Sequence, residues 1–340
     1  MLLMTRTESI ELTAKIQEIV GVFAPAADLS PETLLKIESA KRQGRLPFWN
    51  ENPDMKVQSA LEGFLRQFLM TTSEIAAAGP AADFYRELYR QTKLFLAKDF
   101  TKDAYLRAVR LPEGEIIREG DFRLTMAKYR PGEFFAYNMP SGYQAEQAVA
   151  TAEPLVVPRL GFTEEGFSFP AVYQDGIPWM SACPSEMNSL REPLEHCRTF
   201  VRSKAQRTGK KQKVLVLGLG LAYFPFHIAE EEDVGRLDVV EISRAGIDLY
   251  EHRLKPCFPP KQQEKIHIIE GDAFEILSKV QPGDYDYCFA DTWESQFDGA
   301  KDYLRIKRQE ERLKNENLEM GFSYWIEPEI KAYLKETFGD

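Results

Sequence analysis

The sequence predicts an α/β fold, in which a Rossmann-like, mostly parallel sheet with a shortened C-terminus follows an α-helical and β-rich N-terminal region. The main observation is a short apolar run rich in β-branched residues, Val214 to Leu217, which is typical of a buried parallel strand. Glycines follow this run at once, and a helical pattern follows the glycines. Later apolar runs alternate with helical patterns, as they do in the βαβ units of a parallel sheet.

Residues 1–100 are predicted to form a helical domain. Ser30-Pro31-Glu32 is typical of a helix start, with a capping hydroxyl, a proline at the first helical position and an acid in the first turn. Apolar stripes at helical spacing follow, at Val57, Leu61, Phe64, Leu65 and Phe68 and at Tyr85, Leu88, Tyr89 and Leu96. We interpret these stripes as a helix–helix core, with an aromatic substrate pocket as the less common alternative.

Residues 101–182 have a different sequence pattern, in which Gly, Pro and aromatic residues interrupt short runs that are typical of strands. The runs are Tyr105 to Leu111, Phe122 to Tyr129, Phe134 to Tyr137, Phe167 to Tyr173 and Ile177 to Ser181. Asp175-Gly176, between the last two runs, is a strong hairpin signal. We therefore expect a small β-rich module, with an irregular or helical insertion at Gln144 to Ala152.

Residues 183–340 are predicted to form the Rossmann-like domain. The expected strands are Val214 to Leu217, Leu237 to Val240, Lys265 to Ile269, Tyr285 to Ala290 and Phe322 to Ile326. Helices are expected from Pro184 to about Val201, from Leu221 to about Glu232, over Ala300 to Met320, and after Pro328 to about Thr337. The helix over Ala300 to Met320 has few apolar positions, so we expect it to lie largely exposed.

Gly218, Gly220 and Glu241 form a pattern that indicates nucleotide binding. Glycines after a strand let the backbone turn tightly and approach a ligand, and the helix that follows offers free N–H groups. Glu241 lies 21 residues after Gly220, and an acid about 20 residues on can accept both hydroxyls of a ribose. Tyr223 stands where the dinucleotide fingerprint G-x-G-x-x-G needs its third small residue, which disfavours a dinucleotide. The alternative is an ordinary βαβ unit with a glycine turn and a surface glutamate.

Acidic residues also follow the third and fourth predicted strands, at the sheet edge where open α/β proteins bind ligands. Asp272, with Glu275 three residues on, is equally typical of a helix N-cap. Asp291 shares a loop with Glu294 and Asp298, and such carboxylates can bind an amine, act as a general base, hold a metal or simply be solvated. We favour a functional role for Asp291 and predict no metal site.

From about Tyr173 onward, the sequence resembles the class I S-adenosylmethionine-dependent methyltransferases, and within them the spermidine-synthase-like branch. The resemblance implies S-adenosylmethionine as the cofactor, with Glu241 on the ribose hydroxyls and Asp272 facing the adenine amino group. It implies a catalytic role for Asp291, which would orient or deprotonate the acceptor. The cofactor-binding residues that we expect are Gly218, Gly220, Leu221, Tyr223, Glu241, Ile242, Asp272, Ala273, Asp291 and Trp293. For Trp293, covering the sheet edge is the alternative to stacking on a ligand.

The chain departs from the spermidine synthases in the residues that would hold an amine. Those enzymes have an acidic residue inside the glycine motif, whereas this chain has Leu219 to Ala222 there. Trp179 stands near the position of a glutamine of that family, and the family's Asp-Glu pair is reduced to Ser185-Glu186. Glu186 is expected either to reach the cofactor or acceptor, or to act only as a helix N-terminal acid. These departures favour methyl transfer over aminopropyl transfer.

Composition limits the partners and the setting. A net charge of −10 argues against a nucleic-acid or anionic-membrane partner, since phosphate contacts need clustered Lys and Arg. The four cysteines show no C-x-x-C spacing, and the N-terminus has no apolar run of signal length, which together indicate a cytoplasmic setting. No apolar run has the length of a membrane span.

The prediction is therefore an S-adenosylmethionine-dependent methyltransferase that acts on an unidentified small-molecule acceptor. Two alternatives stay open: an aminopropyltransferase that uses decarboxylated S-adenosylmethionine, and a cofactor-binding protein without catalysis. A helical N-terminal domain of this size often mediates dimers, so a homodimer is a further expectation.

Overall fold

The computed structural model describes residues 93–94, 102–112, 114–129, 134–138, 159–162, 167–174, 177–294, 296–314 and 319–338. The chain divides into two compact units, one formed by residues 1–102 and 128–168 and the other by residues 103–127 and 169–340. Each unit is described below by itself. The stretch 101–182, which we expected to be one β-rich module, contributes residues to both.

In the described part of the first unit, three short strands form a mixed sheet. Strand β5 (Arg159–Phe162) lies in the middle, parallel to β1 (Lys93–Leu94) and antiparallel to β4 (Phe134–Asn138). The strand at Lys93–Leu94 lies within the stripe Tyr85 to Leu96 that we expected to be helical, and pairing with β5 decides the local conformation there. The other expected helices of residues 1–100, and the insertion at Gln144 to Ala152, lie outside the described residues.

The second unit contains a five-stranded parallel sheet in the order β10-β9-β8-β11-β12. Its strands are β8 (Gln212–Leu217), β9 (Val234–Glu241), β10 (Ile266–Glu270), β11 (Tyr287–Ala290) and β12 (Gly321–Tyr324). Strand β8 lies in the middle of the sheet, and β9 and β10 follow toward one edge. The chain then crosses back, and β11 and β12 form the other half. This order is that of a doubly wound, Rossmann-like sheet, which confirms the predicted fold class.

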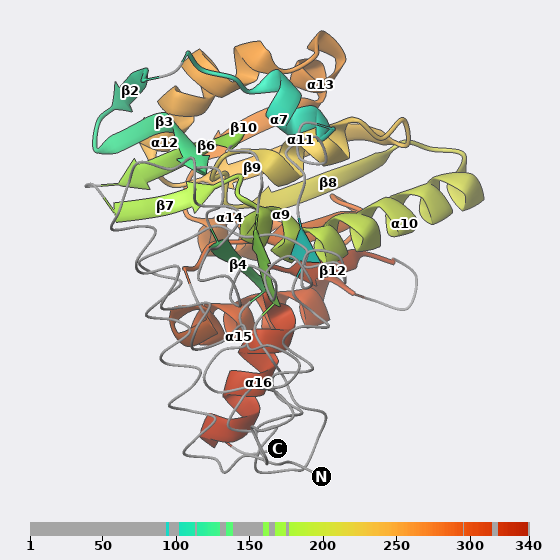
Figure 1. Cartoon of the computed structure of the whole chain (residues 1–340). Helices are drawn as coiled ribbons and strands as arrows, with labels where there is room; N and C mark the ends of the chain where they lie inside the picture. The colour runs from blue at the N-terminus through green and yellow to red at the C-terminus, as the bar shows by residue number, and fades with distance from the viewer. Residues whose placement is uncertain are drawn as a thin grey trace. The chain divides into compact units, whose positions relative to one another are not determined.

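Helices cover both faces of this sheet (Figure 1). On one face, α10 (Arg191–Thr208) and α11 (Tyr223–Ala229) pack, with the rings of Phe224 and Phe289 stacked 3.9 Å apart. On the other face, α14 (Ala273–Lys279), α15 (Gln296–Leu313) and α16 (Glu327–Phe338) enclose an apolar core, which includes Leu217 and Ala290. Because successive strand residues point to opposite faces, β11 and the Val214 to Leu217 part of β8 are apolar at every position between these layers.

Helix α15 corrects the expectation of a largely exposed helix over Ala300 to Met320. It spans Gln296–Leu313, and one side of it is buried: Ala300, Tyr303, Ile306, Glu310 and Leu313. These residues are spaced three or four apart, which places them on one face of the helix. The buried Glu310 accepts a hydrogen bond of 2.6 Å from the Tyr324 hydroxyl and pairs with Lys307, so its charge is compensated.

An antiparallel sheet in the order β2-β3-β6-β7 completes the second unit. Its strands are β2 (Ile116–Glu119), β3 (Phe122–Tyr129), β6 (Phe167–Gln174) and β7 (Ile177–Ser181). Gln174 pairs with Ile177, so β6 and β7 form the hairpin that Asp175-Gly176 predicts, although these two turn residues lie outside the described part.

Helix α7 (Ala104–Ala108) stands where we expected an extended run from Tyr105 to Leu111. A side-chain oxygen of Asp103 accepts the backbone N–H of Leu106 at 3.0 Å, and this N-cap starts the helix. The buried side chains of Tyr105 and Leu106 then hold it against the unit. The expectation missed the capping aspartate at the start of the run.

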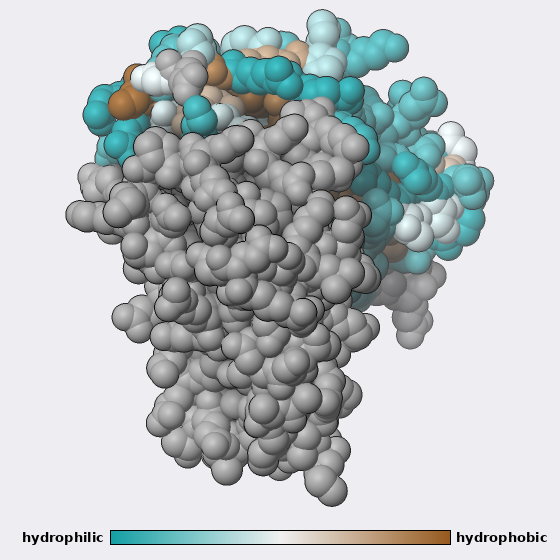
Figure 2. Space-filling model, viewed as in Figure 1, coloured by the Kyte–Doolittle hydropathy of each residue, from teal (hydrophilic) through white to brown (hydrophobic). Residues whose placement is uncertain are grey.

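The remaining helical segments are α9 (Pro184–Ser189), α12 (Arg244–Leu249), η2 (Tyr250–Leu254), η3 (Lys255–Cys257) and α13 (Pro260–Lys265). Among the described residues, no helix has the length and apolar character that crossing a membrane requires. Where Figure 2 shows the surface of described residues, most of it is hydrophilic, with small hydrophobic areas between.

Candidate functional site

A cavity of about 630 Å³ lies at the carboxyl ends of β8, β9, β10 and β11. The strand order changes direction between β8 and β11, and open α/β sheets bind ligands at such a point. The cavity volume falls within the range of about 300–1,000 Å³ that is usual for small-molecule and cofactor sites. Strands β3, β6 and β7, helices α9, α12 and α14, and Trp325 after β12 also contribute to the described wall.

The loop after β8 bends sharply because it has positive φ angles at Gly218 (97°), Gly220 (50°) and Ala222 (55°). A Cβ on Gly218 would stand 1.9 Å from the carbonyl oxygen of Asp291, so only glycine fits there. A Cβ on Gly220 would stand 2.2 Å from the Met180 sulfur. Both glycines line the cavity, but contacts within the protein already require them.

Glu241 ends β9 and lines the cavity next to the loop. Its Oε2 accepts the backbone N–H of Leu219 at 3.1 Å, and its Oε1 accepts that of Ser243 at 2.8 Å. The carboxylate therefore ties the loop after β8 to the end of β9. Each oxygen can still accept one more hydrogen bond, because a carboxylate offers about four lone-pair sites.

Asp272 follows β10 and lines the cavity together with Ala273. Its Oδ1 accepts the N–H groups of Phe274 at 2.7 Å and Glu275 at 3.0 Å, so Asp272 is the N-cap of α14, as its spacing to Glu275 predicts. Its second oxygen takes no part in the cap. Ile242, which also lines the cavity, exposes 70% of its surface.

Two carboxyl groups with raised pKa values share the cavity. Burial raises the pKa of Asp291 to about 8, and the negative charge of Glu186 adds to this effect. Burial also raises the pKa of Glu186 to about 7. Both side chains keep some exposure to the cavity, although the surrounding protein removes them from bulk water. Near neutral pH, the pair therefore holds protons that ordinary carboxylates would have lost.

The described wall of the cavity is acidic. Glu186, Glu241, Asp272, Asp291 and Glu294 line it, and no lysine, arginine or histidine of the described residues does. Low-dielectric walls strengthen the field of those side chains that are charged, and a bound cation would favour the charged forms of Glu186 and Asp291, so the cavity favours a cationic ligand. The described residues contain no group of His, Cys, Asp or Glu arranged to hold a metal ion.

Every tryptophan of the described residues lines this cavity. Trp179 on β7 is 46% exposed, whereas Trp293 after β11 is 6% exposed. Trp325, after β12, donates its indole N–H to the Ser189 hydroxyl at 2.8 Å. Such rings offer flat apolar faces that attract cations as well as aromatic groups.

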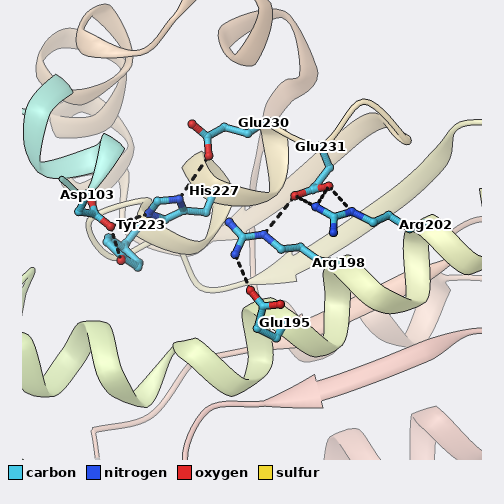
Figure 3. A network of polar contacts seen from close by, with 8 residues as sticks. All are labelled: Asp103, Glu195, Arg198, Arg202, Tyr223, His227, Glu230 and Glu231. Carbon is cyan, nitrogen blue, oxygen red and sulfur yellow. Dashed lines mark hydrogen bonds and ion pairs between the residues drawn. The ribbon is translucent and has the colours of Figure 1, made fainter.

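Two of the residues that we expected at the cofactor, Leu221 and Tyr223, do not line the cavity. The Leu221 carbonyl accepts a hydrogen bond of 2.6 Å from the Tyr105 hydroxyl of α7. The Tyr223 hydroxyl donates to Asp103 at 3.0 Å (Figure 3). The geometry does not support the expected contact of Tyr223 with the cofactor, because α11 directs this side chain toward α7 instead.

The remaining expected residues do line the cavity: Gly218, Gly220, Glu241, Ile242, Asp272, Ala273, Asp291 and Trp293. Sequence reasoning missed Met180, Phe122 and Trp325, which line it as well. Met180 and Phe122 belong to the antiparallel sheet, and no local pattern shows which strand residues face a loop that follows 40 or more positions later. Trp179 could have been predicted to line the cavity, because it is a large aromatic residue that closely follows the hairpin turn.

No protein-family model and no curated protein matches the chain. Similar solved structures include the spermidine synthase from Thermotoga maritima, at 15% identity over 49% of this chain and 56% of that one, with a TM-score of 0.34. A probable spermidine synthase from Corynebacterium glutamicum ATCC 13032 has 13% identity over 58% of this chain and 61% of that one, with a TM-score of 0.33. The methyltransferase domain of bacterial CtHen1-CN has 17% identity over 37% of this chain and 63% of that one, with a TM-score of 0.25.

These matches cover little more than half of the first enzyme's length, and they concern the fold. The strand order of the parallel sheet defines the fold class independently of them. The chain is therefore a Rossmann-like α/β protein, and solved structures similar to it include spermidine synthases and methyltransferases.

Proposed function

We propose that the protein is an S-adenosylmethionine-dependent transferase, with methyl transfer to a small amine as its reaction. One observation carries the proposal: the glycine loop after β8 and the acids after β9, β10 and β11 line a single cavity. The glycine loop lets a ligand approach the backbone closely, the acid after β9 can bind a ribose, and the acid after β10 can bind an adenine. These groups follow one another in the order of the parts of a nucleoside.

The residues present fit an S-adenosyl group. Glu241 has lone pairs left for the two ribose hydroxyls after it accepts its two backbone N–H groups. Asp272 has its second oxygen left for an exocyclic amine, with Ala273 and Ile242 beside it as apolar surface. In addition, the buried Thr292 Oγ1 and Trp293 Nε1 have no hydrogen-bond partner among the described residues.

When bound, the cofactor supplies a sulfonium carbon as an electrophile. The protein's task is to hold an amine in line with that carbon and to remove its proton. In its deprotonated form Asp291 can accept a proton from an ammonium group, and its pKa of about 8 makes it a stronger base than an ordinary carboxylate. The cofactor would supply the methyl carbon that the amine nitrogen attacks and the sulfur that leaves with the electron pair, while Asp291 would hold the proton taken from the amine. Trp179 and Trp325 provide aromatic faces for the organic part of the acceptor.

Aminopropyl transfer is the second candidate, because Glu186 lines the same cavity as Asp291. The sequence argument against this reaction was that the glycine motif lacks an acid for the aminopropyl amine. Glu186, on α9, can supply that carboxylate from another element. The absence of basic residues from the described wall also suits a donor that lacks a carboxylate.

Calorimetric titration with S-adenosylmethionine, S-adenosylhomocysteine, decarboxylated S-adenosylmethionine and NAD tests the proposal. We expect micromolar binding of the first two, weakened about 10- to 100-fold in Glu241→Ala, since a hydrogen bond to a charged group contributes about 1.5–3 kcal/mol. Glu270→Ala is the matched control, because Glu270 ends the neighbouring strand but pairs with Arg244 outside the cavity.

The outcomes separate the candidates. Preference for the decarboxylated ligand would support aminopropyl transfer, and turnover of S-adenosylmethionine with a panel of small amines would support methyl transfer. Binding without turnover of any amine would favour the non-catalytic alternative. If no ligand binds, the glycine turn has only a structural role and the proposal fails.

A further inference from the structure

The loop between β8 and α11 needs support from outside itself. Three positive φ angles fall at Gly218, Gly220 and Ala222, and Ala222 is a buried alanine in the left-handed region. Helix α11 begins directly after Ala222 without a side-chain cap. Backbone in such a conformation persists only where the surrounding structure fixes it.

Helix α7 supplies this support through Tyr105. The Tyr105 side chain is fully buried, and its hydroxyl donates to the Leu221 carbonyl at 2.6 Å. Its ring packs edge-on against Tyr223 and Phe226, with centroids 5.1 Å and 5.4 Å away. Tyr105 therefore contacts both the end of the loop and the helix that follows it.

Asp103 fixes the start of α7 to the same helix (Figure 3). One of its oxygens caps α7, and the other accepts the Tyr223 hydroxyl at 3.0 Å. The same second oxygen lies 3.4 Å from Nε2 of His227, and Nδ1 of His227 lies 3.5 Å from Glu230. A histidine thus stands between two carboxylates, one on each of the two helices.

We propose that α7 is a latch on the glycine loop, in which Tyr105 is a positioning residue for the donor and the Asp103–His227 pair keeps α7 in place. This inference rests on the proposed function, because the loop is assigned to the donor there. Tyr105 and His227 do not line the cavity, so they act through the loop and not on the ligand.

The latch depends on pH. Burial disfavours the charged form of His227, but hydrogen bonds and charges of Asp103 and Glu230 outweigh it, so the pKa of His227 is raised. Burial acts on Asp103 in the opposite direction, but His227 outweighs it, so the pKa of Asp103 is lowered. The ion pair therefore exists above the Asp103 pKa, and it is lost as the pH rises through the His227 pKa.

Other titratable or charged groups surround this pair. Burial and the Asp103 charge raise the pKa of Tyr223, and burial raises that of Cys257 near Tyr105. Arg198 of α10 pairs with Glu231, and Lys265 of α13 donates to the carbonyls of Ala229 and Glu231.

The first test compares Tyr105→Phe with Tyr250→Phe. Both remove one hydroxyl from a fully buried tyrosine, but the Tyr250 hydroxyl has no partner among the described residues. For Tyr105→Phe we expect about tenfold weaker S-adenosylhomocysteine binding and faster hydrogen exchange at the Leu221 and Ala222 amides. Tyr250→Phe should match the wild type in both. Unchanged exchange and affinity in Tyr105→Phe would overturn the latch.

The second test follows S-adenosylhomocysteine affinity from about pH 6 to about pH 9 in the wild type and in His227→Gln, which cannot take up a proton. The cavity carboxyls titrate in this range in both proteins, so the ratio of the two affinities isolates His227. We expect the wild type to bind several-fold more tightly at the low end and to approach His227→Gln at the high end. A constant ratio would overturn the role of the ion pair.

Failure of the proposed function would look different. In that case the wild type would bind no S-adenosyl ligand at any pH, whereas the exchange of the Leu221 and Ala222 amides would still report whether Tyr105 holds the loop.

Discussion

Glu186 and Asp291 belong to separate elements, yet their carboxyl groups share one cavity wall. Removing both from bulk water makes their charged forms costly, and the charge of Glu186 further disfavours that of Asp291. In the folded protein they therefore keep protons that the unfolded chain releases near pH 4. The two carboxyl groups can therefore bind a cation, because a bound ammonium would favour their charged, deprotonated forms.

The stability of the protein should report these protons. Since the native state holds more protons than the unfolded state between about pH 4 and about pH 8, the free energy of unfolding should fall as the pH rises through that range. The loss should be on the order of 2 kcal/mol, because both groups keep some exposure to the cavity.

Urea denaturation at a series of pH values measures this effect. In the double variant Glu186→Gln/Asp291→Asn, the free energy of unfolding should not show this fall with rising pH. The variant should therefore be more stable than the wild type near pH 8. Identical slopes for wild type and variant would show that the two groups titrate as ordinary carboxyls. The His227 ion pair is the same in both proteins, so it does not affect the comparison.

At the residue level, the sequence predicted the side chains that follow strands. Gly218, Glu241, Asp272 and Asp291 could be assigned to one edge because parallel strands present their carboxyl ends together. The direction of the Tyr223 side chain could not be predicted, because it depends on Asp103, which lies 120 positions earlier. The role of Glu186 stayed open for the same reason, since a helix N-terminal acid and a cavity acid have the same local sequence.

At the level of elements, α15 shows how charge can conceal an amphipathic helix. Its sequence is rich in Lys, Arg and Glu, and the apolar stripe of Tyr303, Ile306 and Leu313 is narrow. Burial of that stripe against β12 and α16 was not visible from composition, because Glu310 is itself buried and compensated by Lys307 and Tyr324. The expectation of a largely exposed helix was therefore wrong because it treated every charged residue as solvated, whereas Glu310 is buried with its partners.

Two leucine-sized residues on α15 test this packing. Ile306 is fully buried and Leu304 is 42% exposed. Ile306→Ala should lower the free energy of unfolding by roughly 2–5 kcal/mol, because it leaves a cavity in the core. Leu304→Ala should change it by no more than about 0.5 kcal/mol. Equal effects in urea denaturation would mean that α15 does not pack as described.

The strands were predicted more accurately than the helices. All five strands of the parallel sheet occur within a few residues of their expected positions, since buried strands need continuous apolar runs. Helix α7 was missed because its apolar residues also suit a strand, and only the cap by Asp103 decides between the two. The chain's division into two units, which cuts through residues 101–182, depends on long-range contacts that no local pattern carries.

At the level of the whole molecule, the net charge of −10 and the acidic cavity act in the same direction. S-adenosylmethionine carries a net positive charge, whereas S-adenosylhomocysteine lacks the sulfonium charge and is neutral overall. The field of the protein should therefore speed the association of the first ligand more than that of the second.

Stopped-flow binding at two salt concentrations tests this effect. Between low salt and about 1 M, where the Debye length falls to about 3 Å, the association rate constant of S-adenosylmethionine should fall several-fold. That of S-adenosylhomocysteine should change little, which makes it the matched control. Equal salt dependence of the two rates would exclude electrostatic steering of the donor.

The contact between Gly218 and the main chain of Asp291 bears on protein engineering. Since there is no room for even a methyl group between them, backbone atoms alone set the spacing between the ends of β8 and β11. Trp179 and Glu186 reach the cavity from β7 and α9, which play no part in that spacing. A library randomised at those two positions would therefore vary the acceptor wall while the donor loop and Asp291 keep a fixed separation. If the proposed function holds, the selectivity of the enzyme can be changed in this way without moving Asp291 relative to the donor loop.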